Sequence, residues 1–197
     1  MEFPVVPEQL RDRRIATTRW FARAVLFIAG WKVEGEIPNY PRLIFVVGPH
    51  TSNWDFIFGL VAALAMNLEI HWLGKASLFQ QPMRPLMLWL RGIPVNRQSP
   101  EGVVEDIADK FRQADSLSLI ITPEGTRGKV ERMKTGFLRI AKAADCLLLV
   151  TTLDYRSKTI CLGDTLRASG DMEEDVDQIL CQFAKVTPRH SHNFSGD

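Results

Sequence analysis

His50 and Asp55 are spaced so that they can act together, as a general base and the carboxylate that orients it. They follow an apolar run at residues 43–47 and precede a second one that opens at Phe56. Residues five apart on one helix point about 140° away from each other. The two side chains therefore meet only if His50 lies in a loop and Asp55 near the start of the next helix. The pair Gly48-Pro49 supplies the break that such a loop needs.

A second polar loop, residues 122–129, carries a carboxylate, two glycines and an arginine. It follows a predicted strand at residues 117–121, as the His50 loop follows the one at 43–47. In open α/β sheets ligands bind at the carboxyl ends of the strands, so we expect both loops to lie there. Gly125 allows a close approach of the backbone to a ligand, and Arg127 suits a phosphate. The alternative is a solvated turn with a surface arginine.

Short apolar runs alternate with longer amphipathic segments along the chain. Strands are expected at residues 43–47, 69–73, 93–95, 117–121, 147–153 and 159–162, and helices at 55–67, 86–90, 100–113, 135–144 and 171–185. This alternation predicts an α/β fold with a mostly parallel central sheet flanked by helices. The polarity of residues 187–197 predicts a disordered tail.

The composition is that of one globular domain. A chain of 197 residues with a formal net charge of +1 gives no support for a nucleic-acid partner. Basic residues nevertheless gather between residues 55 and 101 and between 127 and 142, which suits an anionic substrate or surface. The three cysteines, Cys146, Cys161 and Cys181, show no metal-ligand spacing, and no bound metal is expected.

Taken together, these segments resemble the glycerolipid acyltransferase superfamily over roughly residues 30–155. The first motif of that family is a histidine, four residues and an aspartate. The second is a turn ending in an arginine, and the third is Pro-Glu-Gly-Thr-Arg. They are matched in this order by His50 and Asp55, by Gly92 to Arg97, and by Pro123 to Arg127. The chain departs from the family at Pro49, where asparagine is usual, and in residues 147–153, which lack the proline of the fourth motif.

The resemblance implies both a fold and a reaction. The fold is that of the glycerol-3-phosphate acyltransferases. The reaction transfers a fatty acyl group from acyl-CoA or acyl-carrier protein to a lysophospholipid such as 1-acylglycerol 3-phosphate, without a bound cofactor. His50 would take the proton of the acceptor hydroxyl while Asp55 orients the ring. The implied residues for the acceptor's phosphate are Arg97, Glu124, Gly125, Thr126 and Arg127, with Lys75 as a further candidate.

Residues 15–31 have the composition of a helix lying in a membrane interface, because large apolar side chains alternate with arginines. The alternative is an amphipathic helix packed on its own domain. The first ten residues lack the apolar stretch of a signal peptide, and no apolar run is long enough to span a bilayer. We therefore expect an N-terminal interfacial helix (1–35), an acyltransferase domain (36–186) and the tail, attached peripherally to the cytoplasmic face of a membrane.

Other functions fit parts of the same pattern. A metal-dependent hydrolase would use His50 and Asp55 as ligands, but no His, Cys or Asp cluster at suitable spacing supplies the others. A non-catalytic lipid-binding module on the same fold is a second alternative. An acyltransferase for a non-phosphate acceptor, such as a lyso-ornithine lipid, is a third.

Overall fold

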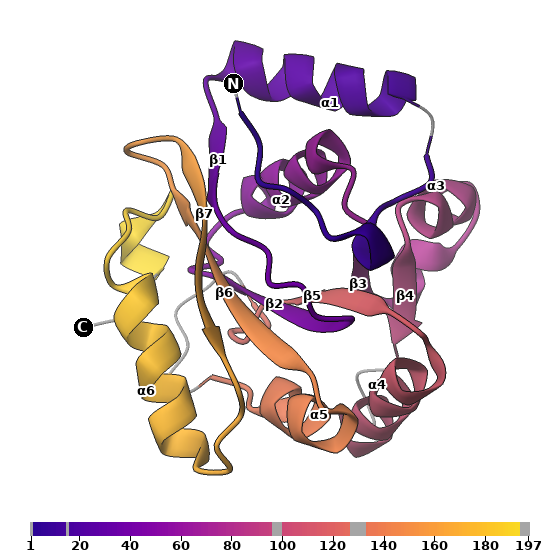
Figure 1. Ribbon diagram of the computed structural model, residues 1–197, viewed down its shortest axis with the longest axis vertical. Helices are drawn as coiled ribbons and strands as arrows, with labels where there is room; N and C mark the ends of the chain where they lie inside the picture. Colours follow the sequence, from indigo (N-terminus) through magenta and orange to yellow (C-terminus); the bar gives the residue numbers. More distant parts are fainter. Residues whose placement is uncertain (1, 15, 96–99, 127–132, 194–197) are drawn as a thin grey trace.

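A seven-stranded sheet forms the middle of the molecule (Figure 1). The structure is a computed structural model that describes residues 2–14, 16–95, 100–126 and 133–193. The strands are β1 (Lys32–Gly35), β2 (Arg42–Gly48), β3 (His71–Lys75), β4 (Gly92–Val95), β5 (Leu117–Ile121), β6 (Leu147–Asp154) and β7 (Thr159–Leu166). Their order is β1-β7-β6-β2-β5-β3-β4, and the neighbouring strands are parallel except β6 and β7. The predicted mostly parallel α/β fold is confirmed.

Helices cover both faces of this sheet. They are α1 (Ala16–Ala29), α2 (Asn53–Met66), α3 (Arg84–Trp89), α4 (Pro100–Gln113), α5 (Gly136–Ala144) and α6 (Met172–Phe183). Figure 1 shows α1 and α2 on one side of the sheet and α4 and α5 on the other. Ile179 and Phe183 of α6 are buried in the same apolar cluster as α4 and α5. No helix among these described segments is long and apolar enough to cross a bilayer.

Strand β2 lies between the two apolar layers and explains why both exist. Leu43, Phe45 and Val47 face the cluster that contains α1 and α2, while Ile44 and Val46 face the cluster of α4, α5 and α6. Successive side chains of a strand point to opposite faces, so a continuous apolar run is buried on both sides. This run anchors the loop that follows it.

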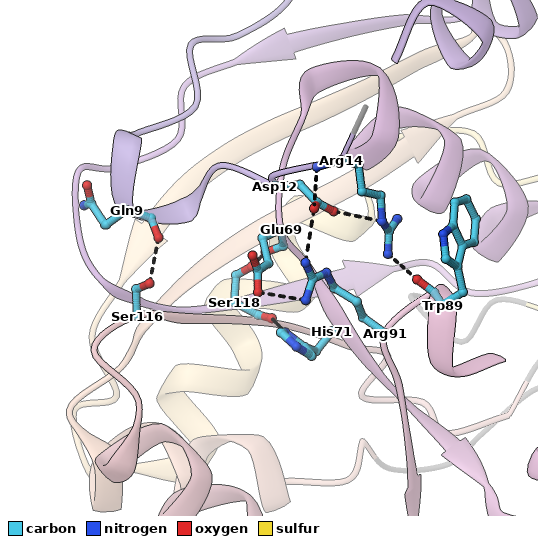
Figure 2. A network of polar contacts seen from close by, with 9 residues as sticks. All are labelled: Gln9, Asp12, Arg14, Glu69, His71, Trp89, Arg91, Ser116 and Ser118. Atoms are coloured by element: carbon cyan, nitrogen blue, oxygen red, sulfur yellow. Dashed lines mark hydrogen bonds and ion pairs between the residues drawn. The ribbon is translucent and has the colours of Figure 1, made fainter. Parts of the chain in front are cut away.

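A polar network joins the residues before α1 to the side of the sheet formed by β3 and β4 (Figure 2). Buried Asp12 pairs with Arg91 (Nη2 to Oδ1, 3.1 Å) and with Arg14 (Nε to Oδ2, 3.3 Å). Arg91 also pairs with Glu69 at 3.0 Å, and the guanidinium of Arg14 lies over the Trp89 ring at 4.5 Å. These contacts tie the start of the chain to α3 and to the segments that lead into β3 and β4.

Three elements differ from the sequence-based expectations. No apolar run in the sequence predicts strand β1. It nevertheless pairs with β7, so residues 32–35 are part of the sheet. Strand β7 continues to Leu166 because it pairs with β6 along its length. Helix α3 begins at Arg84 and not after Pro85, since proline is accommodated in the first turn of a helix.

The C-terminal residues also differ. Polarity predicts disorder from residue 187, whereas Thr187 is hydrogen-bonded to the β6–β7 turn and His190 to the loop that follows β2. The backbone N–H of Tyr155 donates to the carbonyl of Thr187 (2.9 Å), and that of His190 donates to Oγ1 of Thr51 (3.3 Å). Buried Pro188 lies between these two attachments. Backbone hydrogen bonds of this kind leave no signature in composition.

Candidate active site

The loops that follow β2 and β5 meet at one edge of the sheet. The two strands pair in parallel, with Val46 opposite Ile121, so their carboxyl ends lie side by side. The backbone N–H of His50 donates a hydrogen bond of 2.7 Å to Oε2 of Glu124. Two residues 74 positions apart are thereby joined, as the predicted parallel strands require.

His50 lies in the loop and Asp55 in the first turn of α2, the only arrangement in which this spacing lets them meet. Ser52 is the N-cap of the helix, and its hydroxyl accepts the N–H of Trp54 at 3.2 Å. Nδ1 of His50 is 3.2 Å from Oδ2 of Asp55. The ring nitrogen is not aimed straight at the oxygen, so this is a close contact and not a well-aligned hydrogen bond. The side chains are 16% and 1% exposed, respectively.

The Asp55 carboxylate is surrounded by donors. Oδ2 accepts the backbone N–H groups of Thr51 (2.8 Å) and Ser52 (2.7 Å), and Oδ1 accepts the hydroxyl of Tyr155 (2.5 Å). Burial alone raises the pKa of Asp55, but contact with His50 and the hydrogen bonds from Tyr155 and Ser52 outweigh it and lower the pKa below its ordinary value. Asp55 is therefore a fixed anion beside the imidazole.

Glu124 is buried with one oxygen in use. Oε2 accepts the His50 N–H, whereas Oε1 has no hydrogen-bond partner among the described residues. Burial raises the pKa of Glu124, and the hydrogen bond from His50 opposes that rise only in part. The structure thus shows Glu124 fastening the His50 loop. A carboxylate in this position does not attract a phosphate directly, because both are anions.

Gly125 has the left-handed backbone that favours glycine, with φ +64°. A Cβ at this position would lie 2.7 Å from Nζ of Lys134, so the lysine side chain crosses the loop at the glycine. The backbone N–H of Lys134 donates to the carbonyl of Pro123 at 2.8 Å. An exposed ammonium group is consequently held beside the loop that contains Glu124.

A family model described as Acyltransferase matches residues 31–153 of the sequence, and this segment contains both loops. The chain belongs to the acyltransferase family. The fold of this acyltransferase is also similar to the crystal structure of the 1-acyl-sn-glycerophosphate (LPA) acyltransferase PlsC from Thermotoga maritima. That match has a TM-score of 0.64 and 17% sequence identity and covers 89% of this chain and 80% of the other. A search of curated proteins found no match.

The other predicted site residues of the acyltransferase are placed only in part. Lys75 ends β3 at the same edge of the sheet, three residues beyond Trp72, which pairs with Ile120 of β5. Thr126 is exposed next to Gly125. Arg97 and Arg127 lie outside the described residues.

Two neighbours of the acyltransferase site carry no sequence motif. Tyr155 lies in the turn between β6 and β7, two residues beyond the segment that the family model matches. Lys134 follows the second loop as one of several basic residues and is not distinguished from them by its spacing. Only the parallel order of the strands, once known, brings these residues to His50 and Glu124.

Other concave or polar regions lie apart from this site. A pocket of about 540 Å³ is lined by Glu8, Gln9, Arg11, Asp12, Arg13 and Asn67. Asn67 follows the last residue of α2 whereas His50 precedes its first, so the pocket lies at the opposite end of the helix. Within the described ranges, no group of three His, Cys, Asp or Glu side chains is arranged to hold a metal ion.

Proposed function

We propose that this acyltransferase moves a fatty acyl group from an acyl thioester, acyl-CoA or acyl-carrier protein, to the hydroxyl of a lysophospholipid such as 1-acylglycerol 3-phosphate. The observation that carries the proposal is the contact of His50 Nδ1 with the buried Asp55 carboxylate at the carboxyl edge of the sheet. The likeness in fold to an acyltransferase for 1-acyl-sn-glycerophosphate supports this choice of acceptor.

His50 acts as the general base in this proposal. Asp55 faces Nδ1 and favours a proton there, which leaves Nε2 to accept the proton of the acceptor hydroxyl. The acceptor oxygen attacks the thioester carbonyl, the tetrahedral intermediate collapses, and the thiolate leaves with the proton from His50. No enzyme nucleophile is needed, and Ser52 serves as the helix cap.

The acceptor's phosphate requires cations on the same edge of the sheet. Lys75 at the end of β3 and Lys134 beside Gly125 are two exposed ammonium groups that fit this requirement. We propose that they act with Arg97 and Arg127, which the sequence motifs select. A phosphate held by several cations is bound by charge and by charge-assisted hydrogen bonds.

Helix α1 supports contact with a membrane surface, from which a lysophospholipid would come. Ala22 and Leu26 are buried against the domain, while Trp20, Phe21, Phe27 and Ile28 are exposed. The exposed set repeats after seven residues and therefore forms one face, opposite the buried one. We propose that this face lies in the lipid interface, with exposed Arg19 near the head groups.

The test is release of free thiol from acyl-CoA and acyl-carrier protein across a panel of acceptors. The panel contains lysophosphatidic acid, glycerol 3-phosphate, a lyso-ornithine lipid and neutral lysolipids. Loss of the base in His50→Ala should lower the rate on the preferred acceptor by about 10²–10⁴-fold. Unaltered turnover in this variant would refute the mechanism, and no thiol release with any acceptor would favour a non-catalytic lipid-binding module.

The matched control is His71→Asn. His71 opens β3 at the opposite edge of the sheet, with Nδ1 3.3 Å from the carbonyl of Ser118. An asparagine amide can donate to the same carbonyl, so this variant should keep the fold and the rate. Equal losses in both histidine variants would point to misfolding and not to the loss of a base.

A further inference from the structure

Tyr155 is joined to the proposed catalytic pair although it comes from a turn 100 residues away. Its hydroxyl donates to Oδ1 of Asp55 at 2.5 Å, and the other oxygen of this carboxylate is the one beside His50. Tyr155 lies two residues beyond the segment that the family model matches. The inference below rests on the proposed function of His50 and Asp55.

Contacts other than the bond to Asp55 also hold Tyr155 in place. Its ring packs edge-on against Trp31, with centroids 4.9 Å apart. Trp31 is buried and stacks on Phe58 of α2 at 4.5 Å. The backbone N–H of Tyr155 is bound by the carbonyl of Thr187. The hydroxyl is thus directed at the carboxylate by aromatic packing and a backbone hydrogen bond, in addition to its own bond to Asp55.

A hydrogen bond to Oδ1 has two consequences for Asp55. It adds a third donor to the two backbone N–H groups that bind Oδ2, and so further restrains the carboxylate with Oδ2 toward Nδ1 of His50. It also draws off part of the negative charge that the imidazolium would otherwise feel. Burial raises the pKa of Tyr155, and the bond to Asp55 raises it further, so the phenol remains a donor throughout the working range.

We propose that Tyr155 is a positioning residue that acts through Asp55, holding the carboxylate toward His50 and moderating the basicity of the imidazole. Arg189 lies over the Tyr155 ring, 5.7 Å from its centroid, and the backbone N–H of His190 donates to Thr51, so the C-terminal segment contacts both Tyr155 and the His50 loop. The residues that position the pair therefore come from the β6–β7 turn and from the segment at 187–190.

The test is Tyr155→Phe, which removes one oxygen and keeps the aromatic stack. We expect kcat to fall by about tenfold, the effect of one hydrogen bond to a charged group, with no change in the acceptor KM. The Asp55 carboxylate then has more charge to stabilise the imidazolium, so the acid limb of the pH–rate profile should move to higher pH. A merely structural residue would lower the rate without moving the limb.

The chain supplies a matched control, since its only other tyrosine makes the same kind of bond. The hydroxyl of Tyr40 donates to Oδ2 of Asp145 at 2.6 Å. Tyr40 precedes β2 and Asp145 precedes β6, so this pair lies at the opposite edge of the sheet. Tyr40→Phe should leave kcat and the pH profile unchanged.

A double-mutant cycle tests whether Tyr155 acts through Asp55. In an Asp55→Ala background, Tyr155→Phe should change kcat by less than about twofold, because the group through which it acts is gone. The full tenfold loss in that background would overturn the inference. A wild-type rate and pH profile in the single variant, while His50→Ala is inactive, would overturn it and leave the proposed function standing.

An NMR titration of the His50 ring gives the same comparison without turnover. The midpoint should rise in Tyr155→Phe and stay in place in Tyr40→Phe. An unchanged midpoint in both variants refutes the positioning effect. A shifted midpoint in a protein that transfers no acyl group would support the coupling and refute the proposed function alone.

Discussion

Asp55 and Glu124 are two buried carboxylates that hold the same loop, yet their surroundings act in opposite directions. Asp55 accepts three hydrogen bonds and contacts a ring nitrogen, and its pKa is lowered although burial opposes this. Glu124 accepts one hydrogen bond, and burial dominates to raise its pKa. The loop is thus held by two carboxylates. The charge of Asp55 is compensated by its donors, whereas the charge of Glu124 lowers the free energy of unfolding because it is buried with one hydrogen bond.

Glu124→Gln tests that difference. The amide oxygen can still accept the His50 N–H, but the buried charge is gone. A raised pKa means that Glu124 binds its proton more tightly in the folded protein than in the unfolded chain. The wild type therefore loses stability as the pH rises from the pKa of Glu124 in the unfolded chain, about 4.3, through its pKa in the folded protein. At pH 7.5 the urea concentration at the unfolding midpoint should be at least as high for the variant as for the wild type.

The stability advantage of Glu124→Gln should vanish below pH 4, where Glu124 is protonated in both states. Asp55 titrates in the opposite sense: its stabilisation is present above its unfolded pKa and is lost as the pH falls through the lowered folded value. The stability of the variant must therefore be compared with that of the wild type at the same pH, so that the loss from Asp55 is common to both. A variant that is less stable than the wild type at pH 7.5 would show that a cation compensates Glu124.

At the scale of elements, the residues that begin α2 also form part of the candidate active site. Ser52 caps the helix, and Asp55 at its third position reaches back to the N–H of Ser52. This capping box satisfies two backbone donors that would otherwise lack partners. The residues that begin the helix therefore also fix the carboxylate that faces His50, so a local sequence signal predicts the geometry of the pair.

Ser52→Ala separates capping from chemistry. Loss of an N-cap hydroxyl should lower the free energy of unfolding by about 1 kcal/mol. If Ser52 is a cap and not a nucleophile, kcat should stay within a few-fold of the wild type. Asp171→Ala is the control, since Asp171 caps α6 by accepting the N–H groups of Glu173 (3.0 Å) and Glu174 (3.2 Å). A hundredfold loss of kcat confined to Ser52→Ala would assign Ser52 to the reaction.

For the whole molecule, the sequence predicts what depends on local pattern. The apolar run at 43–47 indicates a buried strand, and the spacing of His50 and Asp55 indicates a loop and a helix start, because each signal lies within a few residues. The sequence does not predict strand β1, the contact of Tyr155 with Asp55, or the attachment of residues 187–190. Their places depend on pairing with distant strands and on backbone hydrogen bonds, which side-chain composition does not encode.

The two faces of the molecule differ in their exposed side chains, and this difference supports the proposed contact with a membrane. Helix α1 lies on the face of the sheet opposite α4, α5 and α6, and its outer face exposes Trp20 (73%) and Ile28 (84%). A soluble partner-free surface seldom gathers such large apolar side chains on one helix. The same helix contains arginines and no acidic residue, so an anionic lipid surface complements it in both polarity and charge.

Binding to anionic vesicles tests this asymmetry. Phe27→Ser with Ile28→Ser should weaken co-sedimentation by about tenfold or more, because each apolar side chain transferred from water contributes about 1.5–3 kcal/mol when fully buried. The control is Met172→Ser, an exposed apolar residue of α6 on the other face of the sheet. Neutral vesicles should bind the wild type less well, since the exposed Arg19 then loses its counter-charge. Equal binding of the double variant and the wild type would show that the exposed face of α1 does not bind the lipid surface.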